Sequence, residues 1–321
     1  MKKLFCVMLT MILTLSLFAG CGGAADDGVI SIAIVQQMDH SSLDEIHDAI
    51  VAELEAKAPE LGLQIRCKSF NGQNDGSVLS QIGAQVASGG YDLIIPIATQ
   101  AAQSMVLAAD GNIPVVYAAV SDPEHAGLTG FDNVTGTSDA LNTPYILNMM
   151  FAVQPDIQSV GLLYSNSEPN SVKPIAEAKA YLEEKGIPYV EKTGNSADEV
   201  LAAANALVGK VDAVFTPTDN AIMACEAAVA EILTQAGIPH YTGADSFVFC
   251  GAFATCGVNY TELGTKTAQL ALEVLTTGQV PGHHVMEGGI ITVNTQTAAA
   301  LGLNYEAFST MAGKVKEVVT E

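Results

Sequence analysis

Four polar loops carry the side chains that could do chemistry in this chain, and each follows a short apolar run. They hold hydroxyls, amides and single carboxylates at residues 97–100, 119–122, 165–171 and 216–220. A buried strand followed by such a loop and a helix start is typical of a parallel α/β sheet. Ligands bind such sheets beyond the carboxyl ends of the strands, where free backbone N–H groups collect. Two of these loops lie in each half of the chain, as a two-lobed binding protein requires.

An anionic ligand group would have to be bound by hydroxyls and backbone N–H groups, because Arg66 is the one arginine in the sequence. Bidentate recognition of a carboxylate by a guanidinium group is therefore not expected. Helix starts supply free N–H groups and a favourable dipole. The hydroxyl and amide residues beside such starts, each of which could equally be a helix cap, are Thr99, Gln100, Ser121, Thr137, Ser138, Asn170 and Ser171.

A cationic amine on the ligand would need a carboxylate at the same ends of the strands. Asp219 could accept the amine or cap a helix, and these alternatives stay open. Glu168 could form a hydrogen bond across a hinge instead of meeting a ligand, and Asp122, before Pro123, is typical of a turn. One or two of the aromatic residues near these loops are expected to line a pocket; they are Phe70, Tyr117, Tyr164, Phe215, Phe247, Phe253 and Tyr260.

Enzyme motifs are missing from the sequence. No G-x-G-x-x-G follows the first strand, and neither G-x-x-x-x-G-K-[ST] nor G-x-S-x-G occurs. The six histidines are not spaced as a three-histidine zinc site would need. We therefore expect no catalytic residues, no metal and no cofactor. With 35 acidic against 13 basic residues and a net charge of −22, the chain is also not expected to bind nucleic acid.

The N-terminus has the pattern of an exported lipoprotein. Lys2 and Lys3 precede an apolar run at residues 4–18, and the run ends in Ala-Gly-Cys. This end resembles the bacterial lipobox, although Phe18 stands where that motif usually has Leu, Val or Ile. We expect a signal peptide at 1–20, a lipid on Cys21, a tether at 21–28 and a location outside the cytoplasm on the cell membrane. An ordinary secretory peptide with a chance cysteine is the alternative.

From residue 29 the chain alternates strands and helices. Strands are expected at 29–35, 63–70, 93–97 and 115–120, with helices at 43–58, 77–88 and 100–109. After a helix at 144–151, a second series follows. Its strands are expected at 159–164, 189–192, 213–216, 240–242, 252–258 and 290–293, and its helices at 170–185, 197–208, 221–236, 263–275 and 308–319. This order predicts two Rossmann-like lobes with parallel sheets and right-handed crossovers.

The motifs together resemble the bacterial ABC-transporter substrate-binding lipoproteins of the tryptophan/tyrosine-binding type. The matching stretches are IATQAAQ at 97–103, SDP at 121–123 with GL at 127–128, VTGTSD at 134–139, GLLYSNSEPNS at 161–171, PTDN at 217–220, and GA at 251–252 followed by NY at 259–260 and LG at 263–264. The resemblance covers essentially the mature chain. It implies an α/β fold of the type I periplasmic-binding-protein class, in which two lobes are joined by a three-crossover hinge.

The resemblance also implies lobe boundaries and ligand positions. The N-terminal lobe would comprise 29–140 plus 260–286 and the C-terminal lobe 141–259 plus 287–321, with crossovers near 138–143, 257–259 and 284–288. The ligand positions that it implies are Asn71, Thr99, Gln100, Ser121, Thr137, Ser138, Glu168, Asn170, Ser171, Asp219, Asn220 and Ala252.

The expected function is capture of a small ligand between the lobes and its delivery to an ABC permease with its ATPase. An aromatic or apolar amino acid (Trp, Tyr or Phe) is the expected ligand, and the protein is expected to be a monomer without enzymatic activity. The same fold binding a nucleoside, sugar or small peptide is the alternative, as is a sensory ligand-binding domain or a secreted α/β enzyme. Cys250 and Cys256 could form a disulfide or remain buried thiols.

Overall fold

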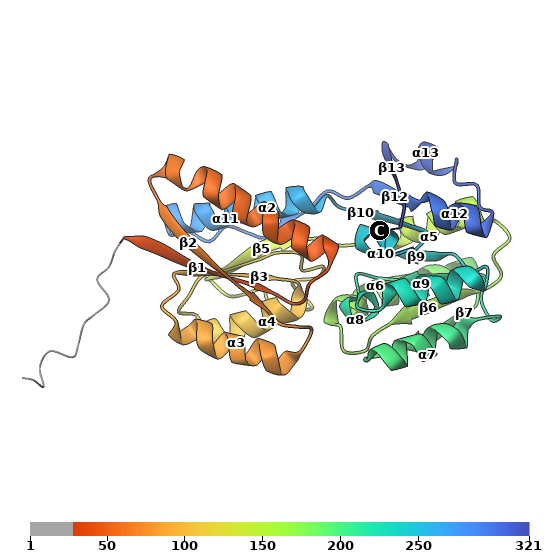
Figure 1. The fold of residues 1–321 in the computed structure, drawn as a ribbon, viewed down its shortest axis with the longest axis horizontal. Helices are drawn as coiled ribbons and strands as arrows, with labels where there is room; N and C mark the ends of the chain where they lie inside the picture. The colour runs from red at the N-terminus through yellow and green to blue at the C-terminus, as the bar shows by residue number, and fades with distance from the viewer. Residues whose placement is uncertain (1–27, 321) are drawn as a thin grey trace, which may run out of the picture.

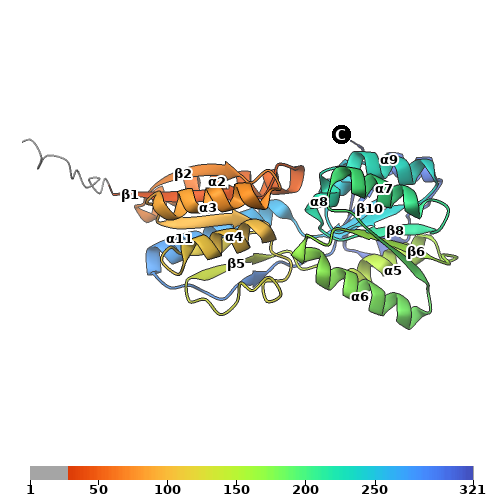
Figure 2. The same cartoon turned by 90° about the horizontal axis from the view of Figure 1, so that it is seen from below.

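The computed structural model describes residues 28–320, so the predicted signal peptide and Cys21 lie outside the described residues. Two α/β lobes lie side by side along the long axis of the molecule (Figure 1; Figure 2). Within the described part of the chain, no helix is both long and apolar enough to cross a membrane.

The N-terminal lobe contains a six-stranded, fully parallel sheet in the order β11-β5-β4-β3-β1-β2. Its strands are β1 (Val29–Gln36), β2 (Gln64–Asn71), β3 (Leu93–Ile97), β4 (Val115–Tyr117), β5 (Val134–Ser138) and β11 (His284–Val285). Helices α2 (Ser41–Lys57) and α11 (Tyr260–Thr277) cover one face, and α3 (Gly76–Ser88) and α4 (Thr99–Ala109) cover the other (Figure 1). The turn η1 (Pro59–Leu61) follows α2.

Strand β1 shows why this sheet is buried on both faces. Ile32 and Ile34 belong to the core on the α2 and α11 side, whereas Ala33 and Val35 belong to the core on the α3 and α4 side. Successive side chains of a strand point to opposite faces, so a continuous apolar run requires a helical layer on each side.

The C-terminal lobe contains a seven-stranded sheet in the order β13-β12-β10-β9-β8-β6-β7. Its strands are β6 (Val160–Tyr164), β7 (Tyr189–Thr193), β8 (Ala213–Thr216), β9 (His240–Thr242), β10 (Ala254–Gly257), β12 (Ile290–Asn294) and β13 (Lys314–Val318). Its helices are α5 (Thr143–Val153), α6 (Pro169–Lys185), α7 (Ala197–Leu207), α8 (Asn220–Met223), α9 (Glu226–Gln235), α10 (Asp245–Phe249), α12 (Thr295–Leu301) and α13 (Phe308–Met311).

The chain passes between the two sheets at residues 139–142, 258–259 and 286–289. After the second passage it enters α11, which packs on α2 of the N-terminal lobe, and after the third it forms β12 of the other sheet. The predicted fold class, two α/β lobes joined by three crossovers, is therefore confirmed.

Several local predictions are wrong. The helix predicted at 308–319 is the short helix α13, and strand β13 follows it and pairs in parallel with β12. The C-terminal sheet is also not wholly parallel, since β12 runs antiparallel to β10. The helix predicted at 221–236 is divided at Ala224–Cys225 into α8 and α9. Elements β5, β11, α10 and α12 are absent from the sequence-based prediction, because they are short and lack a clear period.

Cys256 is a buried free thiol on β10, so the structure contains no disulfide between Cys250 and Cys256. Of the two alternatives for this pair, the structure has the thiol.

Candidate ligand-binding site

A cavity lies between the lobes at the carboxyl ends of the strands, and the volume open to the centre of a water molecule in it is about 30 Å³. Its polar lining residues are His40, Ser42, Thr99, Ser121, Asp139, Asn170, Thr218, Asp219, Asn220, Ser246 and Tyr260. Its apolar lining residues are Leu43, Ala98, Ala119, Met223, Ala244 and Phe247. Both lobes contribute, and the described lining residues include no lysine or arginine.

Five of the predicted ligand positions line this cavity: Thr99, Ser121, Asn170, Asp219 and Asn220. The other seven do not, and they are Asn71, Gln100, Thr137, Ser138, Glu168, Ser171 and Ala252. Of the seven aromatic candidates, Phe247 and Tyr260 are lining residues.

The positions outside the lining have partners elsewhere. Thr137 forms a hydrogen bond with Thr267, and Ser138 donates one to the backbone oxygen of Ser121. Asn71 donates a hydrogen bond to Asp39 at the end of β2. Ala252 is fully buried just before β10. Glu168 and Ser171 form hydrogen bonds with the lining residues Asn220 and Asp219, and Gln100 donates one to Glu168.

The backbone is strained where β3 and β4 reach the cavity. Ala98 has φ +77° and ψ 164°, and Ala119 has φ +53°. Non-glycine residues in such conformations cost about 1–3 kcal/mol and concentrate at functional sites. Ala98, the residue before α4, offers no side-chain cap, and Thr99 follows in the cavity wall. The Gln37 side chain accepts a hydrogen bond from the Gln100 N–H at 3.2 Å, so part of the first turn is already paired. The positive end of α4 and the Thr99 hydroxyl thus form a place for an anionic group.

Asp219 has the geometry of a helix cap. Its Oδ2 accepts hydrogen bonds from the Ser165 N–H and the Ser171 hydroxyl, both at 2.7 Å, and its Oδ1 accepts one from the Ile222 N–H at 3.0 Å. All three donors belong to the C-terminal lobe. Burial raises the pKa of Asp219. The carboxylate therefore holds the start of α8 and the loop after β6 in place.

Asp139, the first residue of the first crossover, is a buried carboxylate with acceptor capacity left. Ser121 Oγ donates to its Oδ1 at 2.9 Å, and the Tyr260 hydroxyl lies 3.5 Å from its Oδ2. Burial raises its pKa. Because the single Ser121 hydroxyl proton goes to Asp139, Thr218 must be the donor in its 3.1 Å hydrogen bond with Ser121. Thr218 of one lobe, Ser121 of the other and Asp139 of the hinge thus form one chain.

Asp139 is a cavity residue that the candidate ligand positions omitted, although it ends the VTGTSD motif. The sequence does contain a feature that could have identified Asp139: it is a carboxylate that directly follows residues 134–138, where the chain changes from apolar to polar. That stretch was not recognised as a strand, so its end was not recognised as part of the site.

Glu168 connects the two lobes. Its Oε1 accepts hydrogen bonds from the side-chain amides of Gln37 at 3.3 Å and Gln100 at 3.2 Å, both in the N-terminal lobe. Its Oε2 accepts one from Asn220 Nδ2 at 3.0 Å, in its own lobe. Glu168 is 1% exposed. Burial first, and the nearby Asp219 carboxylate second, raise its pKa. This is the hinge-type hydrogen bond that the sequence offered as an alternative to ligand contact.

Because of Glu168, the equilibrium between the open and closed lobes should depend on pH. Opening the lobes would return its carboxyl group to water and lower its pKa, so closing takes up a proton between the two pKa values. The closed state is therefore favoured at lower pH and loses this contribution as the pH rises through the raised pKa. We expect Glu168→Gln, which imitates the protonated group, to bind ligand with a flatter profile than the wild type between about pH 5.5 and 8.5.

The measurement is calorimetric titration of both proteins across this range. Asp139 and Asp219, whose pKa values are also raised, are common to both proteins, and the pKa of His40 is lowered by burial to about 4. The difference between the two profiles therefore reports the titration of Glu168 together with its interaction with Asp219, and parallel profiles would contradict its role.

Three cavity residues carry buried polar atoms with no hydrogen-bond partner among the described residues: His40 Nδ1, Asn170 Oδ1 and Ser246 Oγ. Buried polar groups are normally paired, so such orphans indicate where a ligand completes the network. Two of these atoms accept hydrogen bonds, and the hydroxyl can accept or donate. Together with Asp139, they make the cavity rich in acceptors, which suits a ligand with an ammonium group.

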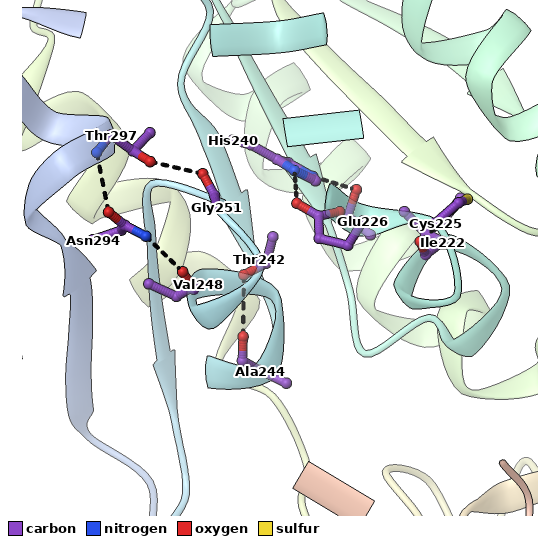
Figure 3. Close-up of polar contacts among 11 residues, drawn as sticks. Ile222, Cys225, Glu226, His240, Thr242, Ala244, Val248, Gly251, Asn294 and Thr297 are labelled. Carbon is purple, nitrogen blue, oxygen red and sulfur yellow. Dashed lines mark hydrogen bonds and ion pairs between the residues drawn. The ribbon is translucent and has the colours of Figure 1, made fainter. Parts of the chain in front are cut away.

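Several buried polar contacts lie in the C-terminal lobe, and one of them, from Thr242 Oγ1 to the backbone oxygen of Ala244, involves a residue of the cavity lining (Figure 3). His240 Nδ1 lies 2.9 Å from Glu226 Oε1, and His240 Nε2 lies 2.8 Å from Thr216 Oγ1. Asn294 caps α12 and donates to the backbone oxygen of Val248 at the end of α10. The first set of bonds joins β8, β9 and α9, and the second joins the end of β12 and the start of α12 to α10. Among residues 28–320, no group of three or more His, Cys, Asp or Glu is arranged to hold a metal.

A family model described as ABC transporter substrate binding protein matches residues 31–316. The chain belongs to this family. The family is one of transport proteins, and substrate-binding proteins of ABC importers act outside the cytoplasm.

Among its relatives, a tyrosine-binding protein of Clostridioides difficile strain R20291 is 32% identical over 94% of this chain and 93% of that one. The structure of an ABC domain in complex with L-Trp from Streptococcus pneumoniae is 29% identical, with a TM-score of 0.83 over 89% of this chain and 99% of that one. A ligand-free, open substrate binding protein from Clostridium difficile is 31% identical, with a TM-score of 0.68 over 91% of this chain and 100% of that one. At similar identity, the TM-score is thus higher for the complex than for the ligand-free, open structure.

Proposed function

We propose that this substrate-binding protein captures an aromatic amino acid, L-tryptophan or L-tyrosine, between its lobes and delivers it to an ABC permease. The observation that carries the proposal is the charge pattern of the cavity. The described lining residues combine one incompletely paired carboxylate, Asp139, with Thr99 at the start of α4, and they include no lysine or arginine. An ammonium and a carboxylate on one ligand match these two features.

The proposed binding mode follows from the lining. The ligand carboxylate accepts hydrogen bonds from the start of α4 and the Thr99 hydroxyl, which replace the missing guanidinium group. The ammonium group donates to Asp139 in a charge-assisted hydrogen bond. The side chain packs against Leu43, Met223 and Phe247, which form an apolar wall. The Trp-bound and tyrosine-binding relatives support an aromatic ligand.

Release to the permease would use the same contacts. A ligand that touches both lobes favours the closed state by its differential contacts, and opening weakens its hold. We propose that the protein acts as a monomer and is tethered through a lipid on Cys21. The tether would keep it near the permease and its ATPase. Membrane fractionation of a Cys21→Ser variant tests the tether.

Thermal-shift measurements on the mature protein without its lipid test the ligand class. Ligand at about 100 times its Kd stabilises the folded state by about 2.7 kcal/mol, so L-tryptophan or L-tyrosine should raise the melting temperature by several degrees. Tryptamine and tyramine, which lack the carboxylate, and indole-3-propionate, which lacks the amine, should each give a much smaller rise. A nucleoside or sugar that raises the melting temperature, while aromatic amino acids leave it unchanged, would contradict the proposal.

A further inference from the structure

Two of the orphan polar atoms lie on the side of the cavity formed by α2 and α10. His40 directly precedes α2, and Ser246 belongs to α10, which packs on α2. Ser42 Oγ donates to Asp245 Oδ1 at 3.3 Å and joins the two helix starts. Ser246 is fully buried, and neither Ser246 Oγ nor His40 Nδ1 has a hydrogen-bond partner in the described part of the chain.

A chain of hydrogen bonds makes His40 Nδ1 an acceptor. Asn220 donates its Nδ2–H to Glu168, so its Oδ1 is turned toward His40 Nε2, 3.3 Å away. An amide oxygen only accepts, so the ring proton is on Nε2. Burial lowers the pKa of His40 to about 4, which keeps the ring neutral at physiological pH. Nδ1 therefore carries a buried, unpaired lone pair in a residue of the cavity lining.

The remaining surface on this side is apolar. Leu43, Met223 and Phe247 line it, and Ala244 completes the wall. A buried acceptor that stays unpaired destabilises the structure that contains it, so a ligand that supplies a donor gains affinity over one that does not. A flat apolar side chain with an O–H or N–H group at its edge fits both the wall and the orphan atoms.

We propose that His40 Nδ1 and Ser246 Oγ recognise a hydrogen-bond donor on the ligand side chain, and that the protein thereby selects a phenol or an indole over a phenyl or aliphatic group. This selection rests on the proposed function, because it assumes that an amino acid occupies the cavity. It adds the residues that distinguish one aromatic amino acid from another.

Calorimetric titrations with L-tyrosine, L-tryptophan, L-phenylalanine and L-leucine test the selection. For the wild type, phenylalanine and leucine should bind about 100-fold more weakly than the better of tyrosine and tryptophan, because they leave the acceptors unpaired. Ser246→Ala should weaken the better ligand about tenfold and leave phenylalanine unchanged. Since Ser246 Oγ has no partner in the described chain, the melting temperature of the ligand-free variant should not fall.

Ser42→Ala is the matched control. It removes a lining hydroxyl that already donates to Asp245, so any change should be the same for all four ligands. Phenylalanine that binds within threefold of the better ligand, or a Ser246→Ala variant that weakens all ligands equally, would overturn the selection while leaving amino-acid binding in place. If none of the four binds, the proposed function fails, and the selection fails with it.

Discussion

Asp139→Asn is expected to weaken the binding of L-tryptophan or L-tyrosine by about 2–5 kcal/mol, the usual effect of removing one partner from a buried charge pair. The variant keeps the shape of the side chain, and its amide oxygen can still accept the hydrogen bond from Ser121. What it loses is the negative charge that the ligand ammonium would contact in a cavity whose described lining includes no lysine or arginine. Titration calorimetry measures the change directly.

Asp122→Asn is the matched control for this prediction. Asp122 follows Ser121 directly but lies outside the cavity lining, where it accepts a hydrogen bond from the His125 N–H. Its carboxylate is 4.0 Å from Lys173 of the other lobe, and exposed pairs of this kind contribute little. Its variant should bind as the wild type does. If Asp139→Asn binds within threefold of the wild type, Asp139 is not the ammonium partner.

Asp219→Ala is expected mainly to lower the stability of the folded protein. It would leave the Ser165 and Ile222 N–H groups and the Ser171 hydroxyl without their buried acceptor, at about 1–3 kcal/mol for each unpaired group before the structure relaxes. We expect the free energy of unfolding of the ligand-free protein to fall by about 3 kcal/mol or more, measured by urea denaturation.

Asp75→Ala offers the comparison at an exposed cap. Asp75 accepts hydrogen bonds from the Ser77 and Val78 N–H groups at the start of α3, and water can replace it there. Its loss should cost about 1 kcal/mol. If Asp219→Ala retains wild-type stability but loses ligand affinity, Asp219 is a ligand group and the capping role is wrong.

The strand–helix alternation predicted the two lobes because buried parallel strands and their crossover helices leave a strong periodic signal. The polar loops after β3, β4, β6 and β8 were predictable for the same reason, and Thr99, Ser121 and Asn170 do line the cavity. Strand β13 was not predictable in this way. Residues 314–318 have little apolar content, and only the neighbouring strand β12 determines their extended conformation.

The remaining cavity residues depend on how the lobes meet. His40 and Ser246 come from segments that no motif singles out, and the contact between the two lobes brings them to the same cavity. The division of roles between Asp139, Glu168 and Asp219 has the same origin. All three are carboxylates at strand ends, and only the positions of their donors show which one caps a helix, which one connects the lobes and which one retains acceptor capacity.

A crystal structure of the mature protein grown with L-tryptophan and with L-tyrosine tests the central claim most directly. The account predicts one amino acid between the lobes, with its ammonium within hydrogen-bonding distance of Asp139 and its carboxylate at the start of α4. A ligand bound elsewhere, or one whose ammonium contacts Asp219 while Asp139 stays apart from it, would contradict the account.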